Sequence, residues 1–445
     1  MNKTLIENLD YVVTVDENAT ILRNVSLLIV DGVITAIGSA AELAEQSQGA
    51  TKVDGRRKLL LPGLINLHTH LPMTLLRGLS EDVDLQGFLK RVWAAEGAAM
   101  DPETAELGAQ LGSLESLQAG STTQLDMYFH HVDVHRGALA VGTRHVGGPT
   151  FFDFPGPDNH TWEQRIGFLE QWPAELAALG GPQVPTAISP HATYTVSQEH
   201  LTDLITVMKT WENPLLTIHI SENEAENIDV VNRFGKSPTQ VLADAGGLTG
   251  EFPVVFGHGV WLSPEDRALV KNARAAVAHC PGSNLKLASG ALDWMQWKAD
   301  GVRIGVGTDG CSSSNDLDMW QAMRLAGLLA RLTAGRSDVT PAVDIIRGAT
   351  IEGARALGMG DLIGSIEVGK RADLTLIDID KAHLTPVHDV HALVVFAAGR
   401  GDVCDVFVDG EHVLRDGHST RIDEAQLLAK SNERGAVAAA AADAS

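Results

Sequence analysis

Two histidines separated by a single residue end an apolar stretch early in the chain. The stretch LPGLINLHTH carries His68 and His70. On a strand, residues i and i+2 face the same side, so two imidazoles in this register can bind one metal ion. An isolated H-x-H pair is equally compatible with two core or loop histidines. The pair is therefore half of a candidate metal site that needs ligands from elsewhere in the chain.

Further side chains capable of chemistry follow other apolar runs. His219 ends the run PLLTIH, and Asp309 follows VRIGVGT. A turn residue before Gly310 is the alternative for Asp309. Three histidines and one carboxylate suit Zn²⁺, Fe²⁺, Co²⁺ or Mn²⁺. We expect one divalent ion, with zinc as the first choice, held by His68, His70, His219 and Asp309.

Two residues stand where acid–base chemistry would need them. Glu222 follows His219 by three residues, so a turn after the strand can bring it to the metal as a general acid/base. A carboxylate at a helix start is the alternative. His258, in FGHGVW, can donate to a developing oxyanion or an attacking water, or it can be a satisfied buried histidine.

Other histidines are assigned to structure rather than to chemistry. His279, in AHCPGSNLKL, is expected to brace a turn. A second group of histidines is expected on a loop and on the solvated face of the following helix. Its members are His130, His131, His135 and His145.

The elements that must position these side chains are strands alternating with helices. Eight apolar, β-rich runs recur between LLLPGLINLHTH and VRIGVGTDG, separated by helix-like stretches. This alternation predicts a parallel sheet, and eight units predict an α/β fold with a (β/α)8 TIM-like barrel. In a barrel, all strand carboxyl ends open onto one face, so residues distant in sequence would share one cavity.

Both ends of the chain carry a different, β-rich texture. NVSLLIVDGVITAIG contains a hairpin turn signal, and SIEVGKRADLTLIDID and VCDVFVDGEHVLRDG return to the same pattern. We expect residues 1–60 and 363–425 to form one small β-sandwich domain, although two unrelated β patches are the alternative. The barrel then spans residues 61–362. Residues 426–445 form a C-terminal helix with an alanine-rich tail, expected to be frayed.

Composition excludes several classes of partner. A formal net charge of −23 over 445 residues disfavours nucleic-acid backbones and anionic membranes. We see no secretory signal and no apolar segment long enough to span a bilayer. The three cysteines form no C-x-x-C pair. We therefore expect a cytoplasmic protein that acts on a small molecule, without a nucleic-acid or membrane partner.

The motifs together resemble those of the amidohydrolase superfamily. Within it, the chain is most similar to the branch of 5′-methylthioadenosine/S-adenosylhomocysteine deaminases and triazine chlorohydrolases. The matching stretches span nearly the whole chain, and the ending SNDLDMW favours the adenosine-type deaminases. They are PGLINLHTHLPMTLLRGLSED, LDMYFH, SPHATYTVS, TIHISENEAE, HGVWL, HCPGSNLKLASG, GTDGCSSSNDLDMW and GSIEVGKRADLTLID.

The resemblance implies a role for each candidate residue in a site with one metal ion. His68, His70, His219 and Asp309 would be the ligands, Glu222 the proton shuttle and His258 the residue that orients the hydroxide or the intermediate. His191 would touch the sugar of a nucleoside. Glu96 would bind ribose hydroxyls when one gap is allowed after Phe88, which stands where relatives carry a tryptophan.

The activity that this resemblance implies is hydrolytic deamination of an aminated purine or nucleoside, such as 5′-methylthioadenosine or adenosine, with release of ammonia. The alternative is hydrolysis of another N-heterocycle of the triazine, pterin, guanine or cytosine type. The resemblance also implies a homo-oligomer, either a dimer or a tetramer.

One departure from the family pattern concerns the loop after the third expected strand. Relatives that use S-adenosylhomocysteine carry arginines there, whereas Pro149 stands at the first of these positions and Arg165 is out of register. An amino-acid tail therefore has no evident carboxylate partner, which leaves smaller adenosine derivatives or other aminated rings open. The aromatic residues of 151–162 would either stack on a substrate ring or pack the barrel rim.

Overall fold

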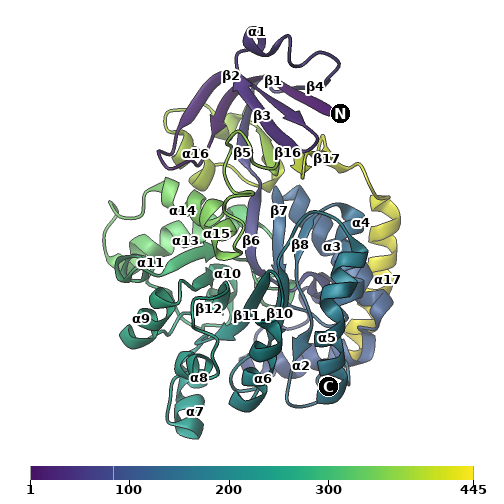
Figure 1. The fold of residues 1–445 in the computed structure, drawn as a ribbon, viewed down its shortest axis with the longest axis vertical. Helices are drawn as coiled ribbons and strands as arrows, with labels where there is room; N and C mark the ends of the chain where they lie inside the picture. Colours follow the sequence, from purple (N-terminus) through teal and green to yellow (C-terminus); the bar gives the residue numbers. More distant parts are fainter. Residues whose placement is uncertain (1, 84, 444–445) are drawn as a thin grey trace.

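Two parallel sheets form the centre of the molecule (Figure 1). The computed structural model describes residues 2–83 and 85–443. The strand orders are β14-β13-β12-β11-β10-β9 and β6-β7-β8. Their bounds are β6 Leu64–Thr69, β7 Ser121–Asp126, β8 Arg144–Val146, β9 Thr150–Phe151, β10 Thr186–Pro190, β11 Pro214–Ile220, β12 Val254–His258, β13 Ala276–His279 and β14 Arg303–Val306.

The central strands are apolar along their whole length because both of their faces are covered. Every residue of β6, β7 and β12 is buried, as expected for parallel strands between helices. The first and last of these strands also lie near each other, since the Asp309 N–H donates to the His68 carbonyl at 2.9 Å. This contact places the motif LINLHTH, which contains His68, next to the motif VGTDG, which contains Asp309.

Helices surround the parallel sheets, and several begin at a serine cap. The side chains of Ser197, Ser237 and Ser263 each accept a backbone N–H of the helix that follows. The bounds are η1 Leu71–Leu76, α2 Leu85–Ala99, α3 Pro102–Gln118, α4 His131–Val141, α5 Trp162–Leu179, α6 Gln198–Met208, α7 Glu224–Phe234, α8 Pro238–Asp244, α9 Pro264–Asn272, α10 Pro281–Lys286, α11 Trp294–Asp300, α12 Cys311–Ser314, α13 Met319–Ala334, α14 Ala342–Gly348 and α15 Ile351–Ala356.

Strands from both ends of the chain share a third, nine-stranded sheet. Its order is β18-β17-β16-β15-β5-β1-β2-β3, with β4 on β1, and β15 pairs antiparallel with β5. The expected turn joins β2 to β3, and both Asp31 and Gly32 have positive φ, as a two-residue hairpin loop requires. The bounds are β1 Lys3–Val13, β2 Ile21–Val30, β3 Val33–Gly38, α1 Ala40–Leu43, β4 Thr51–Asp54, β5 Lys58–Pro62, β15 Leu374–Asp378, η2 Ala382–Leu384, α16 Val390–Phe396, η3 Arg400–Asp402, β16 Val403–Val408, β17 Glu411–Arg415 and β18 His418–Ser419.

The alanine-rich tail is a packed helix rather than a frayed end over its described residues. Helix α17 (Glu424–Asp443, yellow in Figure 1) contacts α2, α3 and η1. Ala438 and Ala442 are buried in this contact. Small side chains let two helices approach closely, which composition alone does not reveal. Among the described helices, none combines the length and the apolar character that crossing a bilayer requires.

The histidines that were expected on a solvated helix face are mostly buried. His131, His135 and His145 are at most 8% exposed. The His135 and His145 rings meet through their Nδ1 atoms at 2.9 Å, and His145 Nε2 lies 3.3 Å from the carboxylate of Asp126. The expectation was wrong because α4 turns this side toward β8 and α5.

Candidate active site

A pocket at the carboxyl ends of the parallel strands collects the chemically capable side chains. About 700 Å³ of space lies within it, mouth included. All the site residues expected from sequence line it except His68, which lies beneath its floor. Those residues are His70, Phe88, Glu96, His191, His219, Glu222, His258 and Asp309.

Four potential ligands converge on one point of the pocket floor. His68 and His70 come from the end of β6, His219 from the end of β11 and Asp309 from the loop after β14. Ligand atoms of His68, His70 and His219 all lie within 4.8 Å of one another. The Nε2 atoms of His70 and His68 lie 3.1 and 3.6 Å from Asp309 Oδ1. The structure therefore brings together residues from three separate strand ends.

The ring orientations fit a divalent cation. His70 donates its Nδ1–H to the Met127 carbonyl at 2.6 Å, and His219 donates its Nδ1–H to the His191 carbonyl at 2.9 Å. Both rings thus keep an Nε2 lone pair for a metal, the usual arrangement for histidine ligands. Burial holds the pKa of His68 and His219 well below the ordinary value, so these imidazoles are neutral. Both His68 ring nitrogens are buried without a hydrogen-bond partner among the described residues, and a metal ion would use the lone pair of one of them.

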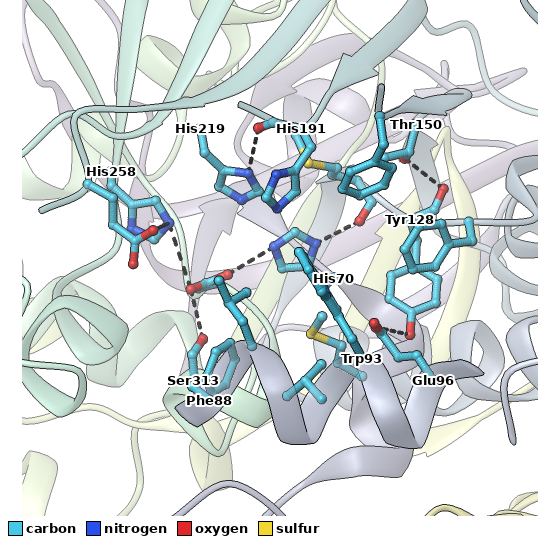
Figure 2. A pocket seen from close by; sticks show the side chains of 18 of the residues that line it. His70, Phe88, Trp93, Glu96, Tyr128, Thr150, His191, His219, His258 and Ser313 are labelled. Carbon is cyan, nitrogen blue, oxygen red and sulfur yellow. Dashed lines mark hydrogen bonds and ion pairs between the residues drawn. The ribbon is translucent and has the colours of Figure 1, made fainter. Parts of the chain in front are cut away.

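Glu222, in the loop after β11, and His258, the last residue of β12, face the potential ligands. His258 Nε2 lies 3.9 Å from a carboxylate oxygen of Glu222 and 3.9 Å from one of Asp309 (Figure 2). Burial raises the pKa of Glu222, which favours a carboxyl that holds a proton it can deliver. Glu222 does not cap α7, because Asn223 performs that function. Glu222 stands directly before this N-cap, and its carboxylate faces His258.

Several positioning contacts escaped sequence reasoning. Asn284 Oδ1 accepts the Nδ1–H of His258 at 2.9 Å, and Ser313 donates to Asp309 Oδ2 at 2.7 Å. Glu226 accepts the backbone N–H groups of residues 221 and 222 and so shapes the loop that carries Glu222. Asn284 lies in the HCPGSN stretch, which was interpreted as a backbone turn. The clue is a polar amide within five residues of a strand end.

One helix supplies much of the apolar lining. Phe88, Leu89, Val92, Trp93 and Glu96 project from α2 into the pocket, and we call this set the α2 wall. Their spacing places them on one side of a helix. Glu96 accepts the Tyr128 hydroxyl at 2.7 Å, and its other oxygen is buried without a partner among the described residues. Burial raises the pKa of Glu96 to about 7.

The aromatic residues after β9 divide between pocket and core. Phe152 lines the pocket and stacks on His191, with ring centroids 4.9 Å apart. Phe151 is buried in the main core, and Trp162 stacks on His200 at 3.7 Å. Phe152 is thus placed where it could contact a bound ring, whereas Phe151 and Trp162 serve packing.

Neither lysine nor arginine lines the pocket among the described residues. Arg165 is buried behind the lining, where it forms an ion pair with Asp158. Its guanidinium also donates to the carbonyls of Thr150 and Pro155 at 3.0 and 2.6 Å. The guanidinium of Arg165 is therefore paired inside the protein and does not face the pocket.

Comparison with known proteins settles the family. The amidohydrolase family model matches residues 59–413. The chain belongs to the amidohydrolase family. Membership confirms the resemblance to this family that the sequence motifs indicated. It also implies the α/β fold of TIM-barrel type that members of the family share.

Relatives of this amidohydrolase include named deaminases. The chain is 36% identical over 412 residues to the 5-methylthioadenosine/S-adenosylhomocysteine deaminase of Pyrococcus furiosus, covering 92% of this chain and 95% of that protein. It is 33% identical to 5-methylthioadenosine/S-adenosylhomocysteine deaminase 1 of Syntrophus aciditrophicus, covering 94% and 93%.

Solved structures extend the comparison. A zinc-bound adenosine deaminase from Xanthomonas campestris has a TM-score of 0.91 at 33% identity, with 98% of each chain covered. A zinc complex of atrazine chlorohydrolase from Arthrobacter aurescens has a TM-score of 0.87 at 22% identity, covering 97% of this chain and 100% of that one. At 22% identity, the similarity to atrazine chlorohydrolase indicates a shared fold only.

Removing one of the converging histidines should abolish metal binding by this amidohydrolase. We expect His68→Ala to weaken metal affinity by at least ~100-fold, because the orphaned ring nitrogens lie at the centre of the group. Metal content after dialysis, measured by elemental analysis, checks this. His418→Ala is the matched control, since that side chain is 79% exposed. A His68→Ala protein with full metal content would remove His68 from the ligand set.

Proposed function

We propose that this amidohydrolase deaminates adenosine-like nucleosides by hydrolysis, with adenosine and 5′-methylthioadenosine as the substrates, releasing ammonia. The observation that carries the proposal is the layout of the pocket. Metal-capable histidines and two carboxylates lie at one end, an apolar aromatic wall follows, and the buried Glu96 lies beyond it. The names of the relatives in Pyrococcus, Syntrophus and Xanthomonas support the same reaction.

The donor set fits one divalent metal ion. We assign His68, His70, His219 and Asp309 as its ligands, with zinc as the first choice and iron, cobalt or manganese as alternatives. The zinc in the Xanthomonas structure supports that choice. When bound, such an ion lowers the pKa of a water molecule to about 7 and supplies a nucleophile at neutral pH.

The carboxylates move the protons of the reaction. Asp309 takes a proton from the attacking water. Glu222 gives its proton to the ring nitrogen next to the carbon that bears the amino group, so no negative charge develops there. His258 steadies the oxygen of the tetrahedral carbon from Nε2, while Asn284 holds its ring. Asp309 then passes the proton that it took to the amino group, and Glu222 takes the hydroxyl proton as the carbonyl forms and the C–N bond breaks. Ammonia leaves, and both carboxyl groups are back in their starting states.

The far end of the pocket binds the sugar in this proposal. The unpartnered oxygen of Glu96 accepts ribose hydroxyls, and His191 donates to the same part of the substrate. Phe88 covers the base from the α2 wall. A buried carboxylate without a partner is costly, and a pair of hydroxyl donors removes that cost.

The same proposal includes the finer architecture. The two parallel sheets form a closed (β/α)8 barrel within residues 61–362, supported by the contact between β6 and β14. Residues 1–60 and 363–425 form a β-sandwich domain, supported by the sheet that both ends share, and 426–445 follow as the C-terminal segment. A dimer or tetramer and a cytoplasmic location stay predictions from the sequence.

The test is ammonia release by metal-loaded protein from a panel of aminated rings. The panel contains adenosine, 5′-methylthioadenosine, guanine, cytosine, an aminated pterin and an amino-triazine. Fast turnover confined to the two nucleosides is the expected result. If only guanine, cytosine, the pterin or the triazine is turned over, that ring type is the substrate class instead of adenosine-like nucleosides. If the metal-loaded protein releases no ammonia from any ring of the panel, the proposal of deamination is rejected.

A further inference from the structure

The α2 wall has one principal structural neighbour. Among the described elements, α17 is the only helix or strand with which α2 shares an extended backbone contact. Figure 1 shows the yellow C-terminal helix running along the side of the molecule that carries α2 and α3. The helix that lines the pocket is therefore held from outside by the end of the chain.

The contact between α17 and α2 continues into the pocket lining. Ala438 and Ala442 of α17 belong to the same apolar cluster as Phe88 and Val92 of the α2 wall. That cluster also contains the pocket aromatics Tyr128, Phe129 and Phe152, and it is separate from the main core. Displacement of α17 would thus be transmitted to pocket side chains through close-packed neighbours.

The buried side of α17 carries Leu427 near its start and only small residues after it. Ser431, Ala438 and Ala442 are at most 9% exposed, and Ala438 is only 1% exposed. A Cβ added at Gly435 would be in ordinary van der Waals contact, 3.5 Å from the Leu75 carbonyl oxygen in η1. Because Ala438 is closely packed, a much larger side chain at this position must displace its neighbours.

The residues that converge on the pocket floor have anchors independent of α17. Segment η1 follows His70 directly, but it packs against α3 as well. The Leu71 N–H donates to Asp126 at 2.6 Å, and Thr74 donates to the Gly108 carbonyl at 3.0 Å. Loosening α17 should therefore shift the α2 wall much more than the histidines.

We propose that α17 positions the α2 wall, so that the C-terminal helix sets substrate affinity without touching the substrate. Ala438 is a positioning residue in this arrangement. The kinetic part of the test rests on the proposed deaminase function, whereas the structural part does not.

The decisive variant is Ala438→Trp, with Ala440→Trp as the matched control on the exposed side of α17. We expect Ala438→Trp to raise KM for 5′-methylthioadenosine roughly tenfold, the effect of about 1.4 kcal/mol, with kcat within about threefold of the parent. Metal content should stay unchanged. Ala438→Ser, which keeps a small side chain, should restore the parental KM.

Hydrogen exchange supplies a readout that needs no substrate. Amides of residues 87–99 should exchange faster in Ala438→Trp, while those of residues 64–69 and 214–220 keep their rates. Equal KM and equal exchange in the two tryptophan variants would overturn the proposal. Should Ala438→Trp not fold, Ala438→Leu provides the same comparison. If no nucleoside is deaminated, the proposed deaminase function is rejected. The hydrogen-exchange data still test whether α17 positions the α2 wall.

Discussion

Replacing Glu222 by glutamine is expected to lower kcat by ~10²–10⁴-fold while the metal content stays at its parental level. The amide keeps the shape of the side chain and its contact with Ser289, but it cannot deliver a proton to the ring nitrogen. Because Glu222 is not among the four assigned ligands, its loss should not release the metal. Steady-state ammonia release and elemental analysis measure the two effects separately.

Glu224→Gln is the matched control for this variant. Glu224 begins α7 two residues away and is exposed, so its replacement changes the same charge near the same loop. We expect its kcat to remain within about twofold of the parent, as for most surface substitutions. A Glu222→Gln enzyme that retains more than about a tenth of parental kcat would contradict the proton-shuttle role.

S-adenosylhomocysteine is expected to be used with a kcat/KM at least ~10²-fold lower than that of 5′-methylthioadenosine. The two nucleosides differ at the 5′ end, where the first carries an ammonium and a carboxylate and the second a neutral methylthio group. No lysine or arginine lines the described pocket, and the charge of Arg165 is already used by Asp158. A carboxylate buried without a cation is costly.

A gain-of-function variant sharpens this comparison. Phe154 is 38% exposed and lies against Trp93 of the α2 wall, with ring centroids 5.7 Å apart. Phe154→Arg should improve the use of S-adenosylhomocysteine relative to 5′-methylthioadenosine by roughly tenfold, because it places a cation at this wall. Phe234→Arg, at a 36% exposed position on α7, should leave the ratio unchanged. Equal kcat/KM values for both nucleosides in the parent enzyme would contradict the prediction.

From the sequence alone we could predict the family, the parallel strands and the residues on which the chemistry is proposed to rest. These features follow from local patterns: apolar runs predict buried strands, and a polar residue where a strand ends lies on the face where the strand ends meet. His68 with His70, His219, and Asp309 could be chosen in this way because each one follows its own strand. The hairpin turn at residues 31–32 is equally local.

The contacts between these residues and the elements that support them became known only from the three-dimensional packing. Asn284 of α10 bonds His258 at the end of β12, and Phe152 enters the pocket while its neighbour Phe151 packs in the core. The side of α4 that bears His135 is buried, and an alanine-rich tail becomes the support of the α2 wall. The physical reason is that sequence spacing defines the face of a single element, whereas burial and contact depend on which other element packs against that face.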